Sequence, residues 1–222
     1  MSQHIAQNLL KIQQDITSMA KHYGRSEQDI ALVAVSKFQS IEMIEEAIRA
    51  GQYRFGENRV QEAIEKWTIL KEKYSHLPLK LHLIGSLQTN KVKEAVALFD
   101  VIEVIDRPKL LVALKKEMDR QQRYPACLIQ VNIGEEPQKS GVMPQELPQL
   151  IALAQKEQVT IEGLMCIPPQ HGNAALYFGL LVSMAKEAHL HTLSMGMSGD
   201  YEHAIMMGAT HIRLGTAIFG ER

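Results

Sequence analysis

The sequence has little that would set it apart from ordinary globular proteins. It contains only two cysteines among 222 residues, Cys127 and Cys166, and each lies within an apolar run. Two such cysteines form neither a disulfide framework nor a spaced metal site, so we predict buried, reduced thiols and no bound metal. The formal net charge is only -1, which gives no overall field that would recruit nucleic acid or an anionic membrane.

Long hydrophobic stretches are also absent. No stretch approaches the roughly 18 apolar residues that a membrane-spanning helix needs. The first residues, Met1 to Asn8, lack the basic start and the unbroken apolar core of a signal peptide. We therefore expect a cytoplasmic protein that contacts no membrane. The sequence is 45% hydrophobic and 22% charged, which suits a single domain over residues 1–222 with a well-buried core.

Short apolar runs rich in β-branched residues alternate with helical patterns along the chain. The runs cover residues 31–37, 53–57, 79–85, 101–106, 124–132, 159–167, 192–197 and 211–217. Eight strands separated by helices indicate a parallel sheet with both faces covered. We predict an α/β fold, a closed (β/α)₈ TIM barrel, with an open doubly wound sheet as the alternative.

One more helix is expected ahead of the first strand. Apolar residues recur at helical spacing from Ile5 to Met19, and the pattern ends near Gly24. Within the alternation, Thr89 or Asn90 is predicted to cap the helix that follows it. Gly208 is predicted to end the last full helix.

Chemically distinctive residues gather at the ends of the predicted strands. They are Lys37, Glu57-Asn58, Gly85-Ser86, Asn132 and Ser198, with Arg213 inside the eighth run. In a barrel these strand ends share one rim, where active sites of this fold are built. In an open sheet the first and last strands need not meet, so this distribution favours the barrel.

Lys37 ends the first run, Ala31-Leu-Val-Ala-Val-Ser-Lys37. Because side chains alternate along a strand, Val33, Val35 and Lys37 share one face. A lysine over a barrel mouth loses water, which favours the neutral amine, and a neutral amine can form a Schiff base with an aldehyde. The alternative is a solvated lysine at a strand end.

A phosphate could bind where the seventh and eighth strands end. Ser198-Gly199 precedes a helical pattern over 200–207, and Gly215-Thr216 follows Arg213. Backbone N–H groups at a helix start favour an anion, and barrels often hold phosphate after strands seven and eight. The alternative is a serine helix cap with routine turn glycines. An amine and a phosphate cradle together suggest a phosphorylated aldehyde, of which pyridoxal 5'-phosphate (PLP) is the obvious one.

Arg213 lies between Ile212 and Leu214, and a buried guanidinium needs an acceptor. The acceptor could be a core carboxylate or the ring nitrogen of a pyridine. A donor that keeps its own proton leaves that nitrogen unprotonated, which makes the ring a poorer electron sink. Asn58 could cap the next helix or hydrogen-bond a ring substituent, and His82 is expected to be a satisfied core histidine.

Six sequence blocks, in order along nearly the whole chain, resemble the pyridoxal phosphate homeostasis proteins, a group similar to the barrel domain of alanine racemase. The blocks are Leu32-Val-Ala-Val-Ser-Lys37, Phe55-Gly-Glu-Asn58 with Val60-Gln-Glu62, His82-Leu-Ile-Gly85 with Leu87-Gln-Thr-Asn-Lys91, Gly163-Leu-Met165, Leu193-Ser-Met-Gly-Met-Ser198 and Arg213-Leu-Gly-Thr-Ala-Ile-Phe-Gly220. Leu81 stands where a tryptophan is common in the family, a difference that concerns packing more than chemistry.

The resemblance implies one cofactor and a set of residues that hold it. It implies a fold-type III barrel with PLP as an internal aldimine on Lys37, phosphate contacts from Ser198, Gly215 and Thr216, Arg213 near the pyridine nitrogen, and Asn58 near the cofactor. It also implies a carrier or regulator of PLP levels, in vitamin B6 supply to PLP-dependent apo-enzymes, with no catalytic residue assigned.

The end of the chain is relevant to catalysis. The sequence stops at Phe219-Gly-Glu-Arg222, whereas similar racemases carry a further β-domain that supplies a tyrosine acid/base. A two-base racemase needs a proton donor on each face of the aldimine, and Lys37 serves only one. We therefore expect a monomeric PLP carrier with little or no turnover. A PLP-dependent amino-acid racemase or lyase, and a Schiff-base aldolase acting on a sugar phosphate, are the alternatives.

Overall fold

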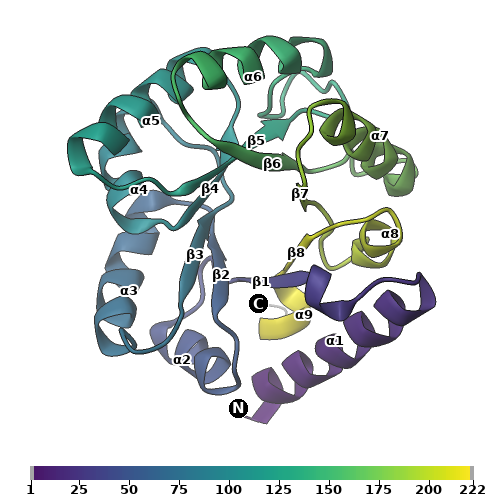
Figure 1. Ribbon diagram of the computed structural model, residues 1–222. Helices are drawn as coiled ribbons and strands as arrows, with labels where there is room; N and C mark the ends of the chain where they lie inside the picture. The colour runs from purple at the N-terminus through teal and green to yellow at the C-terminus, as the bar shows by residue number, and fades with distance from the viewer. Residues whose placement is uncertain (1–2, 221–222) are drawn as a thin grey trace.

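The computed structural model describes residues 3–220 as a closed barrel of eight parallel strands surrounded by helices (Figure 1). The strands are β1 (Ala31–Val35), β2 (Arg54–Glu57), β3 (Lys80–Leu83), β4 (Val101–Ile105), β5 (Ala126–Val131), β6 (Ile161–Cys166), β7 (Thr192–Ser194) and β8 (His211–Leu214). Each strand pairs with the next, and β8 pairs with β1. The predicted TIM barrel is therefore confirmed, and the open sheet was the wrong alternative.

The helices lie outside the strands. They are α1 (Gln3–His22), α2 (Ile41–Arg49), α3 (Val60–Lys73), α4 (Val92–Leu98), α5 (Pro108–Gln121), α6 (Leu147–Lys156), α7 (Ala174–Glu187), α8 (Tyr201–Met206) and α9 (Thr216–Phe219). The expected extra N-terminal helix is α1, which buries Ile5, Leu9, Ile12 and Ile16. Its Asn8 side chain donates a hydrogen bond to the Ile218 carbonyl at 2.9 Å, so α1 packs beside α9.

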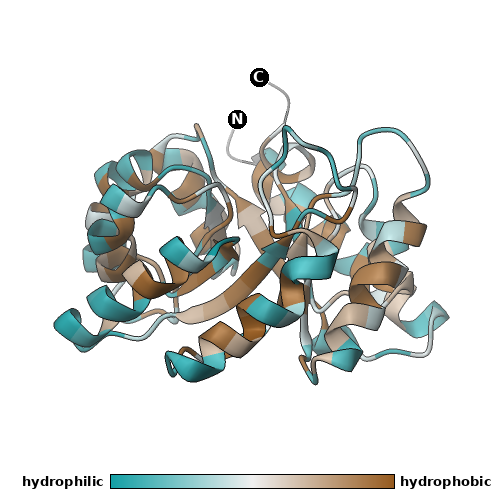
Figure 2. Ribbon diagram, turned by 90° about the horizontal axis from the view of Figure 1, so that it is seen from above, coloured by the Kyte–Doolittle hydropathy of each residue, from teal (hydrophilic) through white to brown (hydrophobic). Residues whose placement is uncertain are grey.

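Alternation along the strands separates two buried layers. Leu32 and Ala34 belong to the core between strands and helices. Val33 is also fully buried, but it lies inside the barrel, where its side chain is 3.2 Å from the position a Cβ would take on Gly56. Figure 2 shows the hydrophobic residues along the strands and the hydrophilic residues on the outer helix faces. This is the burial expected of a parallel sheet covered on both faces.

Several strands end earlier than the apolar runs predict. The first ends at Val35, so Lys37 lies in the turn that follows. The seventh ends at Ser194, because the chain turns away at Gly196 with φ of +94°, a conformation that glycine adopts without strain. The eighth ends at Leu214, because Thr216 already begins α9.

The predicted helix caps agree only in part with the structure. Gly208 follows the capping residue Met207 with φ of +103°, so α8 ends as predicted. The predicted cap at Thr89 or Asn90 is wrong, because these residues form a 3₁₀ turn and Lys91 precedes α4 without a side-chain cap. Propensity rules cannot anticipate such a turn when it continues directly into the helix.

The sequence also led to predictions about the cysteines, membrane-spanning helices and the N-terminal segment. Cys127 and Cys166 are free and buried as predicted, and burial raises the pKa of each thiol to about 12. Within residues 3–220, no helix is long and apolar enough to cross a membrane. The segment considered for a signal peptide begins with Met1 and Ser2, which lie outside the described residues, as do Glu221 and Arg222 at the other end.

Candidate functional site

Lys37 lies just beyond the carboxyl end of β1. Ser36 donates its backbone N–H to the Gly56 carbonyl at 3.0 Å, so pairing with β2 continues up to the residue before Lys37. The Ser36 hydroxyl points to the outer face, where it donates to Glu57 at 2.7 Å. Lys37 itself begins the turn that follows β1, at the carboxyl-end rim of the barrel. It is partly buried, and it forms no hydrogen bond or ion pair with any other residue the structure describes.

The phosphate candidates come together from two loops. Thr216 donates from its hydroxyl to the Ser198 hydroxyl at 3.3 Å. Gly215 is the N-cap of α9, so Gly215 and Thr216 open a short helix and do not end a strand. Ser198 is not a helix cap either. Asp200 precedes α8 and accepts a hydrogen bond from the Met197 N–H at 2.6 Å.

Strand register brings Lys37 to the same rim as these hydroxyls. Val33 pairs with Arg213 across β1 and β8. Two residues on, a Cβ on Gly215 would lie 3.5 Å from the Val35 Cβ, so these residues are level with each other. Lys37 lies two residues beyond Val35, and Thr216 lies one residue beyond Gly215. Lys37 and Thr216 therefore both lie beyond the carboxyl ends of two paired strands, at the same rim of the barrel.

Arg213 is buried inside the barrel and fixed by two acceptors. One terminal nitrogen, Nη1, donates to the Ser194 hydroxyl at 2.7 Å, and Nη2 donates to the Cys166 carbonyl at 2.8 Å. The alternative of a direct pair with a core carboxylate is wrong, because Ser194 stands between Arg213 and Glu103 and donates to Glu103 at 2.5 Å. A guanidinium has five N–H donors, so donors remain for a ligand at the mouth.

Glu103 is the buried anion beneath this arginine. It is fully buried in β4, and its Oε1 lies 2.6 Å from Nδ1 of His82. Burial alone would raise the pKa of Glu103, but the His82 hydrogen bond and the charges of His82 and Arg213 outweigh burial and lower it to about 2. His82 is thus the satisfied core histidine that was predicted. Its ring lies 5.8 Å from that of His211, whose pKa burial lowers to about 4.

Asn58 lies at the same rim, directly after β2. It is not the cap of α3, because Arg59 occupies that position. Its backbone packs on Gly85 so closely that a Cβ there would lie 2.3 Å from the Asn58 carbonyl oxygen. Gly85 therefore fixes the loop that carries Asn58. Asn58 is partly exposed, and it borders a cavity that Ser86 and Leu87 also line.

Sequence reasoning missed Glu103 and Ser194. A signal was present for Glu103, an acid at the centre of Val101-Ile-Glu-Val-Ile105, since a charge in an apolar strand needs a buried partner. Two other polar strand-end residues do not face the mouth. Glu57 faces outward and accepts from Trp67 at 3.1 Å, and Asn132 donates within its own loop to the Glu136 carbonyl at 2.8 Å.

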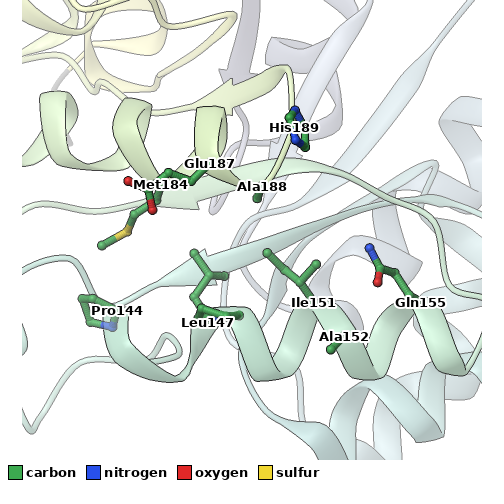
Figure 3. Close-up of a pocket in the computed structure, with 10 residues that line it drawn as sticks. Pro144, Leu147, Ile151, Ala152, Gln155, Met184, Glu187, Ala188 and His189 are labelled. Carbon is green, nitrogen blue, oxygen red and sulfur yellow. The ribbon is translucent and has the colours of Figure 1, made fainter.

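Of two cavities on the surface, one lies beside a candidate site residue at this rim and the other does not. One of about 570 Å³ opens beside Ser198 and is lined by Met197, Gly199 and Asp200 among others. The second, of about 530 Å³, is an apolar groove between α6 and α7, with Leu147, Ile151 and Met184 among its lining residues (Figure 3). None of the candidate site residues lines the second groove, so the chemistry is expected at the rim.

Comparison with known proteins agrees with this geometry. Residues 7–222 match the alanine racemase N-terminal domain family. A pyridoxal phosphate homeostasis protein of Vibrio cholerae is 40% identical over 98% of this chain and 96% of its own length. That of Escherichia coli K12 is 39% identical over 98% of this chain and 97% of its own.

A solved structure of a related protein shows the same barrel. PipY of Synechococcus elongatus, determined without and with PLP bound, aligns with TM-scores of 0.85 and 0.79. In both comparisons the identity is 36%, and the alignment covers 97% of this chain and 100% of PipY. With its near-complete match to curated relatives, the chain belongs to the pyridoxal phosphate homeostasis protein family, whose barrel is that of the alanine racemase N-terminal domain.

Proposed function

We propose that this chain binds PLP through Lys37 and serves in PLP homeostasis by holding and releasing the cofactor. One observation carries the proposal. The Lys37 amine is unpaired among the described residues and lies at the end of β1, beside the turn where β8 presents Gly215 and Thr216. A PLP-bound structure of PipY, 36% identical over 97% of this chain, supports it.

The groups at the mouth match those of PLP. PLP supplies an aldehyde, which the Lys37 amine attacks. A C=N bond then replaces the C=O bond, and the aldehyde oxygen leaves as water. Ser198 and Thr216 can donate their hydroxyls to a phosphate, and Gly215 leaves room for its close approach. The 3.3 Å contact between the two hydroxyls supports one shared anion site.

Arg213 and Asn58 complete the proposed cofactor site. Two of the Arg213 nitrogens are fixed by Ser194 and Cys166, so the guanidinium is held in one orientation. Its remaining N–H groups donate to the ring nitrogen in our proposal, and Asn58 donates to a ring substituent. Because guanidinium keeps its proton, the ring nitrogen stays unprotonated and attracts electrons weakly.

This electronic setting suits carbanion chemistry less than an aspartate partner would, since an arginine leaves the ring a weaker electron sink. The 39–40% identical relatives are named as homeostasis proteins. We propose that the chain acts as one monomeric barrel domain, that no residue serves in catalytic turnover, and that PLP-dependent apo-enzymes receive its cofactor.

The proposal is tested by loading purified protein with PLP and following two properties. We expect a visible absorbance band that hydroxylamine removes, and that is absent in Lys37→Ala. In D₂O, exchange of amino-acid α-protons should proceed no faster than with free PLP. Exchange at about 1 s⁻¹ or faster, the range of ordinary enzymes, would show a racemase or lyase and overturn the carrier function.

A further inference from the structure

A buried ionic cluster lies on the outer face of the barrel, directly behind Lys37. Its centre is Glu57, the last residue of β2, which is completely buried. One carboxylate oxygen, Oε1, accepts from the Ser36 hydroxyl at 2.7 Å and from the Trp67 indole at 3.1 Å, and it lies 2.8 Å from the Lys66 amine. The cluster thus joins β1, β2 and α3 at the rim that carries Lys37.

Lys66 extends the cluster to the backbone beside Lys37. Its amine donates to the Ser36 carbonyl at 2.9 Å and to Glu62 at 2.9 Å. Glu62 also accepts a hydrogen bond from the Phe38 N–H. Burial alone would raise the pKa of Glu62, but these hydrogen bonds lower it below its ordinary value. The residues on both sides of Lys37 are therefore fixed by the same group of charges.

The turn that the cluster holds is strained. Phe38 has φ of +61°, in the left-handed region that bulky non-glycine residues seldom adopt. Such a conformation is unfavourable and persists only where surrounding contacts enforce it. Here Glu62 holds the Phe38 N–H, and the Arg59 guanidinium lies 5.8 Å from the Phe38 ring centre.

Stability is a poor explanation for the cluster. A buried ion pair often stabilises a fold no better than apolar side chains of the same volume. The second Glu57 oxygen, Oε2, is buried without a hydrogen-bond partner among the described residues, which adds a desolvation cost. Leucine and methionine could fill this space between strand and helix, so the charges call for a reason other than packing.

We infer that Glu57, Lys66 and Glu62 are positioning residues for Lys37, which fix the turn from Ser36 to Phe38 so that the Lys37 amine reaches the PLP aldehyde. The inference rests on the proposed function of Lys37 and names what orients it. The three residues act from the outer face and do not contact the cofactor. Their effect is on the alignment of amine and aldehyde, a step in which misplacement by about 1 Å can cost a factor of about 100 in rate.

The experiment compares two ligands in three variants. Lys66→Met and Glu62→Ala disturb the cluster. Lys71→Met is the matched control, because Lys71 is on the same helix and donates in the same way to a carbonyl and a carboxylate, those of Leu98 and Asp100, both at 2.7 Å. PLP reports formation of the covalent bond through its visible band. Pyridoxine 5'-phosphate has the same ring and phosphate but an alcohol in place of the aldehyde, so it reports the pocket alone.

We expect the rate of covalent bond formation to fall about 10- to 100-fold in Lys66→Met and Glu62→Ala. Affinity for pyridoxine 5'-phosphate should stay within about twofold in both, and Lys71→Met should match wild type with both ligands, since distant sites act independently. A role in structure alone would lower both readouts together.

Three outcomes decide between the possibilities. If both variants react with PLP at the wild-type rate, or if affinity for pyridoxine 5'-phosphate falls as far as the rate, positioning of Lys37 is overturned. If Lys66→Met does not fold, Glu62→Ala, whose side chain is more exposed, decides alone. Wild-type protein that never reacts with PLP overturns the proposed function itself, which distinguishes that failure from failure of the positioning cluster.

Discussion

Two lysines beside the end of β1 differ in their surroundings. Lys37, in the turn after β1, is partly exposed and has no hydrogen-bond acceptor among the described residues. On the outer face, the Lys66 side chain is only 10% exposed and contacts three oxygens, from Ser36, Glu57 and Glu62. An ammonium has three donors, so the Lys66 amine is fully occupied. The two amines therefore differ in their free hydrogen-bonding capacity, which is why we propose Lys37 as the reactive amine and Lys66 as a positioning residue.

The largest effect is expected from Lys37→Ala, which removes the amine on the inner face. Covalent binding of PLP should be lost completely, because no other group at the mouth is proposed to attack the aldehyde. The free energy of unfolding should change by about 0.5 kcal/mol or less, since the side chain makes no hydrogen bond or ion pair with a described residue. Absorbance titration with PLP and urea unfolding measure the two quantities. A Lys37→Ala protein that keeps the visible band would show that Lys37 is not the amine that binds PLP covalently.

On the outer face, a large change in the free energy of unfolding is expected. Lys66→Met leaves the Glu57 carboxylate buried without its counter-ion, so we expect unfolding to become easier by about 3–5 kcal/mol. Loss of Lys71 should matter less, about 1 kcal/mol, because its partner Asp100 keeps Arg123 as a second counter-ion at 2.9 Å. Urea unfolding of both variants without PLP measures this difference.

A double variant separates the effect of these charges on stability from their effect on the rate of covalent bond formation. Replacing both charges, with Glu57→Leu and Lys66→Met together, should recover most of the stability lost in Lys66→Met, because apolar side chains fill such a site well. It should not recover the rate of covalent bond formation with PLP. Recovery of the rate together with stability would mean that the charges have no role beyond the fold.

Inside the barrel, Glu103 is expected to give a pH-dependent contribution of about 3 kcal/mol. Its pKa is about 2 in the folded protein, against an ordinary value of 4.5. Between these values the unfolded chain binds more protons than the folded protein, so the contribution is complete above pH 4.5 and is lost as pH falls toward 2. Urea unfolding of wild type and Glu103→Gln should therefore differ most at neutral pH and converge in acid. A difference that grows in acid would contradict this sign.

The smallest effect is expected at the phosphate end. Thr216→Val and Ser198→Ala each remove one hydroxyl from the proposed anion site, and a hydrogen bond to a charged group is worth about 1.5–3 kcal/mol. We expect each variant to weaken binding of pyridoxine 5'-phosphate roughly 10- to 100-fold, as measured by calorimetry. Unchanged affinity in both variants would show that these hydroxyls do not bind the phosphate. It would not contradict the proposed role of Lys37.

The order of elements was readable from the sequence because each strand of a covered parallel sheet is a short apolar run and each helix an apolar stripe. Closure of the barrel was predicted because chemically distinctive residues end several of the apolar runs, and such ends share one rim in a barrel. Strand ends were less readable. Gly196 and Gly215 turn the chain out of β7 and β8 earlier than hydropathy indicates.

The partners of buried charges could not be read from the sequence. Glu57 and Asn58 are neighbours at the end of β2, yet Glu57 is completely buried in the outer cluster while Asn58 is partly exposed at the rim. Lys66 is one of several lysines along α3, and only packing distinguishes it from Lys71 and Lys73. Such pairings join segments 10 to 30 residues apart, and no local pattern specifies which distant carboxylate a lysine meets.

We propose the unpaired Lys37 amine as the covalent anchor of PLP. Borohydride reduction of the wild-type protein with bound PLP, followed by proteolysis and mass mapping, identifies the lysine that carries it. We expect a single phosphopyridoxyl group, attached to the peptide that contains Lys37. A reduced group on Lys66 or on any other lysine, with Lys37 unmodified, would contradict it.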